Sequence, residues 1–184
     1  RAEEVEQRYP GKITHSIISI QDLFERMVIN TLDEDYKKYG SGFVWCMGCK
    51  LAMHTRTIIY MVENDIYRVA DGSSFATSEM VEQMPLSVAK IRGFYCDYGF
   101  PFRNPVYTDL REDSIKVLKR MGFRQGLRIR DRFLGIQPKC KPGELYYMPY
   151  LFFNKAMKHD EPVVGKFIKE KTAICHQVMT EYFR

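Results

Sequence analysis

The residues of this chain best suited to chemistry are Cys46 and Cys49, which form a C-x-x-C motif in the stretch FVWCMGCKLAMHTRTIIY. Apolar residues recur at helical spacing after the motif, so the cysteines are expected at the start of a helix. There both sulfurs can face one point, and the helix dipole lowers the pKa of a thiol. Thiolates bind soft metals. The motif alone is compatible with a redox pair, half of a zinc site, part of an iron–sulfur site or two packed thiols.

Cys140 is a third candidate ligand, because its surroundings are typical of a loop. It lies between two prolines in GIQPKCKPGE, with Lys139 and Lys141 on either side. Three thiolates can hold a cubane iron–sulfur cluster and leave one iron open, whereas a closed structural zinc site takes four ligands. Cys96 is the candidate for that fourth ligand, although its helical segment is more typical of a packed thiol. Cys175, on an apolar stripe, is expected in the core.

An acidic glycine turn, RVADGSS, follows the predicted helix. It places Asp71, Gly72 and Ser73 at the end of a short predicted strand. Sheets of α/β proteins bind ligands at the carboxyl ends of their strands, and N–H and hydroxyl groups in such turns bind phosphate. An Asp-Gly turn is also common without any function, so the motif gains weight only beside the cysteines. His54, on the preceding helix, is expected at the surface.

Positive charge gathers around Cys140 in the sequence. Between positions 116 and 141 the chain has nine basic residues and one acidic residue. Such an excess attracts the phosphates of a nucleotide or a nucleic-acid backbone, although a solvated face has the same composition. The residues predicted to bind nucleic acid are Arg124, Arg128, Arg130, Arg132, Lys139 and Lys141.

Length and composition exclude several classes of protein. The chain has 184 residues, 45% of them hydrophobic and 28% charged, which is typical of a globular protein and not of a disordered one. No apolar run approaches the roughly 20 residues that cross a bilayer. Five cysteines, an odd number spread unevenly, favour reduced thiols over a disulfide scaffold. We therefore expect a cytoplasmic protein.

Strands and helices are predicted to alternate along the chain. The predicted elements include strands at 12–20 and 66–70 and helices at 47–63, 86–99 and 111–122. This alternation predicts an α/β fold with a doubly wound, mostly parallel sheet. We expect an α/β domain carrying the cysteines at 1–142 and a helical C-terminal extension at 143–184. Its last helix has one apolar stripe, made of Val164, Phe167, Ile168, Ile174, Cys175, Val178 and Tyr182.

The order of these motifs resembles the PP-loop ATP pyrophosphatases. The stretch CMGCKLAMHTRTIIYMVENDIYRVADGSS, followed by the lone Cys140 in its basic loop, carries the likeness, which covers about residues 10–142. Within that family the chain is most similar to the iron–sulfur-dependent tRNA thiolation enzymes and related sulfur-insertion proteins.

The resemblance implies ATP-dependent sulfur transfer to an adenylated substrate, with tRNA as the expected one. It implies a [4Fe–4S] cluster on Cys46, Cys49 and Cys140, with zinc as the alternative metal. It also implies a pocket for ATP with Mg. The residues that would border this pocket are Asp71, Gly72, Ser73 and Lys50.

The chain departs from the family in one respect, because the phosphate loop SGG-x-[DE]-S is not present. The predicted strand at 12–20 would correspond to the family's third strand. We therefore expect a second chain, or an N-terminal segment, to supply the loop. Two other interpretations stay open. One is a non-catalytic zinc-binding module that binds nucleic acid or a partner protein, and the other is a PP-loop relative that acts on a small heterocycle.

Overall fold

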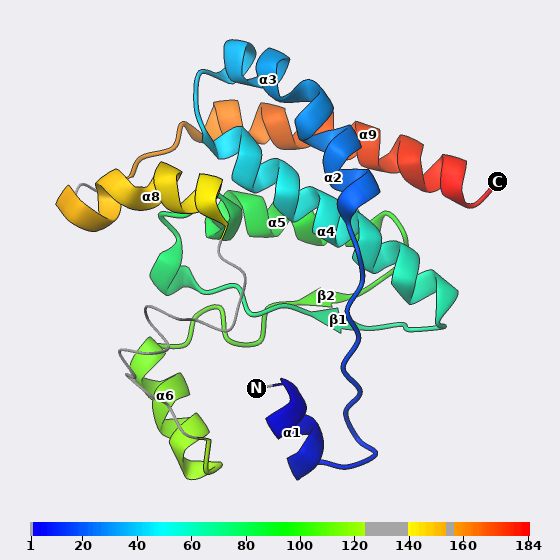
Figure 1. The fold of residues 1–184 in the computed structure, drawn as a ribbon, viewed down its shortest axis with the longest axis vertical. Helices are drawn as coiled ribbons and strands as arrows, with labels where there is room; N and C mark the ends of the chain where they lie inside the picture. Colours follow the sequence, from blue (N-terminus) through cyan, green and yellow to red (C-terminus); the bar gives the residue numbers. More distant parts are fainter. Residues whose placement is uncertain (1, 124–139, 154–156) are drawn as a thin grey trace.

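The computed structural model describes residues 2–123, 140–153 and 157–184. Most of the described residues are helical (Figure 1). The elements are α1 (Ala2–Arg8), α2 (Gln21–Met27), η1 (Ile29–Thr31), α3 (Leu32–Tyr39), α4 (Phe43–Glu63), β1 (Val69–Ala70), η2 (Phe75–Thr77), η3 (Val81–Gln83), α5 (Pro85–Cys96), β2 (Phe102–Arg103), α6 (Arg111–Arg120), α8 (Lys141–Phe153) and α9 (Glu161–Tyr182).

The prediction of a doubly wound α/β sheet is wrong. The structure is 65% helix and 3% strand. Within the described residues the sheet consists of β1 and β2 alone, which pair in parallel with Val69 opposite Phe102 and Ala70 opposite Arg103. The predicted strand at 66–70 is therefore reduced to its last two residues, and the chain before it runs in a loop.

The Ile-rich segment 12–20, predicted as a buried strand, forms no regular element and is largely exposed. The side chain of Ile17 is 90% exposed. Figure 1 shows the segment running as an extended chain between α1 and α2. The β-branched residues favour the extended backbone, but a strand also needs a neighbour to supply its hydrogen-bond ladder. Among the described residues, no backbone hydrogen bond joins 13–19 to another strand.

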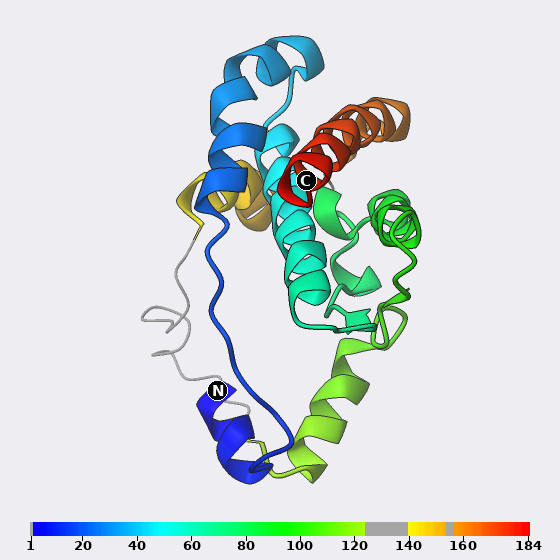
Figure 2. The same cartoon turned by 90° about the vertical axis from the view of Figure 1, so that its right-hand side faces the viewer.

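Helix α4 lies at the centre of the helical body, with α2, α5 and α9 packed around it (Figures 1 and 2). Met47, Leu51 and Ile58 on α4 are completely buried. Edge-to-face aromatic contacts join α4 to α9, and the rings of Phe43 and Phe167 lie 5.4 Å apart between their centroids. Aromatic pairs of this geometry stabilise a core beyond the area that they bury.

The apolar stripe predicted for the last helix is largely confirmed. Of its predicted members Val164, Phe167, Ile168, Cys175 and Val178 are buried. The prediction is wrong for Tyr182, whose side chain is 48% exposed at the end of α9. Its hydroxyl donates to Glu63 at the end of α4, at the edge of the helical body.

Lys171 interrupts this stripe with a buried charge, and its side chain is 4% exposed. The ammonium lies 2.5 Å from an Asp35 carboxylate oxygen on α3 and donates hydrogen bonds to the Met27 carbonyl and the Thr31 hydroxyl. These partners join α9 to the α2–α3 turn. A buried cation is tolerated because its attraction to Asp35 and its hydrogen bonds replace its hydration.

We predict that Lys171→Ala lowers the free energy of unfolding by about 3 kcal/mol, because it leaves the partly buried Asp35 without its cation. Urea denaturation followed by circular dichroism measures the change. The matched control is Lys37→Ala, which removes an exposed ion pair with Asp33 and should change stability by less than about 0.5 kcal/mol. Equal effects of the two substitutions would contradict the structural role given to Lys171.

Candidate metal site

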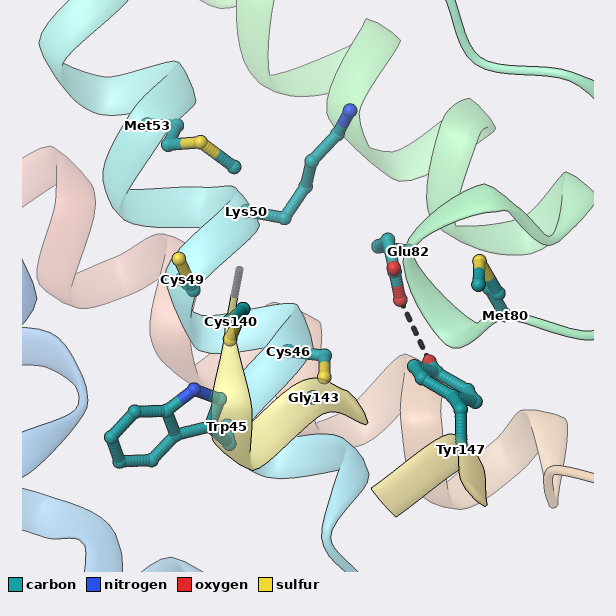
Figure 3. A pocket seen from close by; sticks show the side chains of 10 residues that line it. All are labelled: Trp45, Cys46, Cys49, Lys50, Met53, Met80, Glu82, Cys140, Gly143 and Tyr147. Atoms are coloured by element: carbon teal, nitrogen blue, oxygen red, sulfur yellow. Dashed lines mark hydrogen bonds between the residues drawn. The ribbon is translucent and has the colours of Figure 1, made fainter. Parts of the chain in front are cut away.

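Cys46, Cys49 and Cys140 line one pocket of about 310 Å³ (Figure 3). Cys46 and Cys49 are three residues apart in α4 and therefore lie on the same side of the helix. Cys140 directly precedes α8, which packs against α4. Two segments that are far apart in the sequence thus bring three thiols to the same pocket.

The rest of the pocket wall is mostly apolar, with few polar groups. Trp45, Met53 and Met80 supply apolar surface, and Lys50, Glu82 and Tyr147 supply polar groups. Figure 3 shows the three sulfurs and the Glu82 carboxylate around a common space. Apolar walls lower the local dielectric constant, so charges in this space interact more strongly than they would in water.

Gly143, in the first turn of α8, leaves the space between two of the thiols open. A Cβ atom built on this glycine would lie 3.3 Å from the Cys140 sulfur and 3.7 Å from the Cys46 sulfur. A side chain at this position would therefore occupy the volume that a metal centre needs beside the two sulfurs. The glycine is buried, and its φ is not in the left-handed region. The limited space beside the two sulfurs, and not the backbone conformation, explains why position 143 is a glycine.

The pocket supplies three thiols as potential soft ligands. In the described part of the chain, no three His, Cys, Asp or Glu side chains are placed to chelate one metal ion. The three thiols are part of the wall of one pocket. In an iron–sulfur cubane each thiolate binds a different iron, whereas tetrahedral zinc needs all its sulfur ligands at about 2.3 Å from one ion.

The pKa values of the pocket thiols are raised. Burial is the main cause and raises the pKa of Cys46 to about 12, and the negative charge of Glu82 adds to the effect. Burial also raises the pKa of Cys49, followed by the charge of Cys140. The expectation of thiols acidified by the helix start is thus wrong for the metal-free chain, because burial outweighs the helix dipole. A metal centre would displace these protons and supply the missing positive charge.

The raised pKa values also bear on whether Cys46 and Cys49 could act as a redox pair. A dithiol that exchanges disulfides needs an accessible thiolate near neutral pH. The raised pKa values of Cys46 and Cys49 keep both thiols protonated there. Disulfide exchange through these two thiols is therefore disfavoured near neutral pH.

Asp71, predicted to border a nucleotide, is held by protein groups at the carboxyl end of β1. Lys50 lies 2.8 Å from one carboxylate oxygen, and the N–H and hydroxyl of Ser73 donate hydrogen bonds of 3.0 and 2.8 Å. Asn104, directly after β2, donates to the other oxygen. These donors outweigh the effect of burial and lower the pKa of Asp71 to about 2. Asp71 thus joins the ends of both strands to the cysteine-bearing helix.

His54 is buried behind this group, contrary to the expectation of a surface position. Its Nδ1 lies 2.9 Å from the Tyr95 hydroxyl, and its ring packs edge-on against Phe102. Its Nε2 lies 4.0 Å from Asp71, and no hydrogen-bond partner reaches it. Burial and then the Lys50 charge lower the pKa of His54 to about 3. The imidazole is therefore neutral at pH 7, and its contact with Asp71 is not an ion pair.

The other predicted site residues are distributed as follows. Gly72 is exposed, and Ser73 is buried against Asp71. Cys96 is exposed at the end of α5 and does not line the cysteine pocket, whereas Cys175 is buried in the core as expected. Lys141 is exposed at the start of α8. Arg124, Arg128, Arg130, Arg132 and Lys139 lie outside the described residues.

Sequence reasoning missed Glu82, Tyr147 and Gly143. Glu82 belongs to a single 3-10 turn with no motif around it, and Tyr147 is one of several aromatic residues in α8. Gly143 did carry a signal, because a glycine three residues after a candidate ligand permits close approach.

Comparisons with protein families, with curated proteins and with solved structures give no significant match to this chain. None of the described helices is long and apolar enough to span a membrane.

We predict that Asp71→Asn lowers the free energy of unfolding at pH 7 by about 1–2 kcal/mol, because it removes the ion pair with Lys50. The pKa of Asp71 is lower in the folded chain than its ordinary value of 3.8. Its contribution is therefore complete above about pH 4 and disappears as the pH falls toward 2. Urea denaturation at a series of pH values measures the difference between the variant and the wild type. Asp65→Asn, on an exposed turn, is the control, and a difference independent of pH would contradict the assignment.

Proposed function

We propose that this chain binds a [4Fe–4S] cluster through Cys46, Cys49 and Cys140 and is the cluster-bearing part of an ATP-dependent sulfur-transfer enzyme. The observation that carries the proposal is the meeting of these three thiols in one pocket with an open volume between them. The substrate proposed first is an adenylated tRNA. The resemblance to PP-loop thiolation enzymes supports this choice, together with the basic run before Cys140.

The proposed cofactor would supply an iron without a cysteine ligand, which can bind sulfide as a Lewis acid. The residues of the chain would have three roles toward this cofactor. The three cysteines bind it, the apolar wall of Trp45 and Met53 keeps water away, and Lys50 places a cation at the pocket wall. That cation favours an anionic phosphate or sulfide near the site.

The nucleotide part of the proposal depends on a second component. Asp71 and Ser73 bond to each other and to Lys50, so these groups order the turn that would face a nucleotide. We propose that a second chain or an N-terminal segment supplies the phosphate loop for ATP and Mg. The structural role of Asp71 is then to fix the position of Lys50 between the two sites.

We predict that the chain, purified without oxygen or reconstituted with iron and sulfide, is brown and holds four irons, absorbing broadly in visible light. Cys46→Ser, Cys49→Ser and Cys140→Ser should each lose most of this absorbance, because three thiolates are the minimum for the cluster. Cys96→Ser is the matched control and should keep it. A colourless protein with one equivalent of zinc would contradict the cluster and favour the zinc-binding module.

We further predict that the triple variant Arg124→Glu, Arg128→Glu and Arg130→Glu binds tRNA at least about tenfold more weakly and with a shallower salt dependence, because phosphate contacts are lost. The control carries the same charge change on exposed lysines of α5 and α9, as Lys90→Glu, Lys166→Glu and Lys169→Glu. Filter binding at several salt concentrations measures both. Equal affinities of the two triple variants would remove the case for tRNA and favour a small heterocyclic substrate.

A further inference from the structure

Glu82 is the acidic side chain in the wall of the cysteine pocket. It lies in η3, on a different segment from any of the three cysteines. Figure 3 shows Glu82 across the pocket from Cys49, with its carboxylate directed toward Tyr147. A carboxylate in a mostly apolar pocket is costly unless a cation or hydrogen bonds compensate it. The question for Glu82 is therefore which group compensates its negative charge in this pocket.

A buried tyrosine fixes the direction of this carboxylate. The Tyr147 hydroxyl donates to Glu82 Oε2 at 2.8 Å and accepts from the Val81 N–H at 3.2 Å. The Tyr147 side chain is 5% exposed. Its only hydroxyl proton is thus committed to one oxygen of Glu82. Within the described part of the chain, the other oxygen, Oε1, accepts no hydrogen bond.

The cation in the described pocket wall, Lys50, is paired with another carboxylate than Glu82. The Lys50 ammonium, which also lines the pocket, is 2.8 Å from Asp71 and is held there. Glu82 instead lines the same pocket as the three cysteines. Three thiols and a carboxylate in one low-dielectric space become mutually compatible as anions only when a positively charged centre lies between them.

We propose that Glu82 is the fourth protein ligand of the metal centre, bound through Oε1 and held in place by Tyr147. This inference rests on the metal centre of the proposed function. Cys96, the sequence's candidate for a fourth ligand, is instead exposed at the end of α5. An oxygen ligand is harder than a thiolate and is more readily displaced from a thiophilic metal. Glu82 would therefore protect the fourth iron at rest and leave it when sulfide or a substrate sulfur binds.

The test is the stability of the fourth iron in the reconstituted chain. Under a fixed dose of oxidant, Glu82→Ala should lose one iron about ten- to a hundredfold faster than the wild type. Electron paramagnetic resonance would show the product as a three-iron cluster. Glu82→Cys, which restores a fourth ligand, should retain four irons. Tyr147→Phe should lie between the wild type and Glu82→Ala, because the carboxylate stays but its support is lost.

Two controls separate this role from a general effect on folding. Glu79→Ala removes a nearby carboxylate that does not line the pocket and should behave as the wild type. Unfolding curves of the metal-free variants report whether Glu82→Ala still folds, and Glu82→Cys gives an independent result if it does not. Retention of the fourth iron in Glu82→Ala at the wild-type rate would overturn the inference and leave the proposed cluster intact.

The remaining outcomes concern the metal itself. A wild-type chain that binds neither iron nor zinc overturns both the proposed function and the role of Glu82. A zinc protein whose affinity falls about ten- to a hundredfold in Glu82→Ala would overturn the cluster and support Glu82 as a ligand. A zinc protein unaffected by the substitution would overturn both.

Discussion

The packing of α4 is the constraint on which the rest of the structure depends. One helix must present Met47, Leu51 and Ile58 to the core and Cys46 and Cys49 to a pocket. The helical period makes this possible, because residues three and four apart share a face and the residues between them lie on the next one. The core therefore fixes the rotation of α4 about its axis. That rotation in turn fixes the direction of both thiols before any metal binds.

Asp71 and Glu82 are two acidic side chains near α4 that differ in their hydrogen-bond partners. Asp71 receives hydrogen bonds from Lys50, Ser73 and Asn104 and is stable as an anion without any ligand. Within the described residues, Glu82 accepts one hydrogen bond, from Tyr147. Asp71 thus has its charge compensated inside the protein by Lys50, whereas the cation in the pocket wall is not paired with Glu82.

Local sequence patterns account for the placement of two cysteines on α4, but not for the fold. The positions of Cys46 and Cys49 follow from local helical periodicity, which a single sequence records directly. The wrong sheet prediction arose from 12–20, whose β-branched residues look the same whether or not another strand lies beside them. Pairing of strands is a non-local property. Lys171 and Glu82 could not be predicted for the same reason, because their partners Asp35 and Tyr147 lie far away in the sequence.

The third thiol is positioned by the docking of α8 and not by α4. Tyr146 packs closely over Gly42, where a Cβ atom would lie 2.5 Å from its ring, and its hydroxyl is 3.1 Å from that of Ser41. The neighbouring Tyr147 joins α8 to Glu82 on η3. Cys140 therefore completes the pocket only while α8 is docked. A metal centre that binds all three thiols must by linkage stabilise the docked helix, by as much as docking improves its own affinity. Docking of α8 and binding of the proposed metal centre are therefore coupled, and Tyr147, which joins α8 to Glu82, takes part in both.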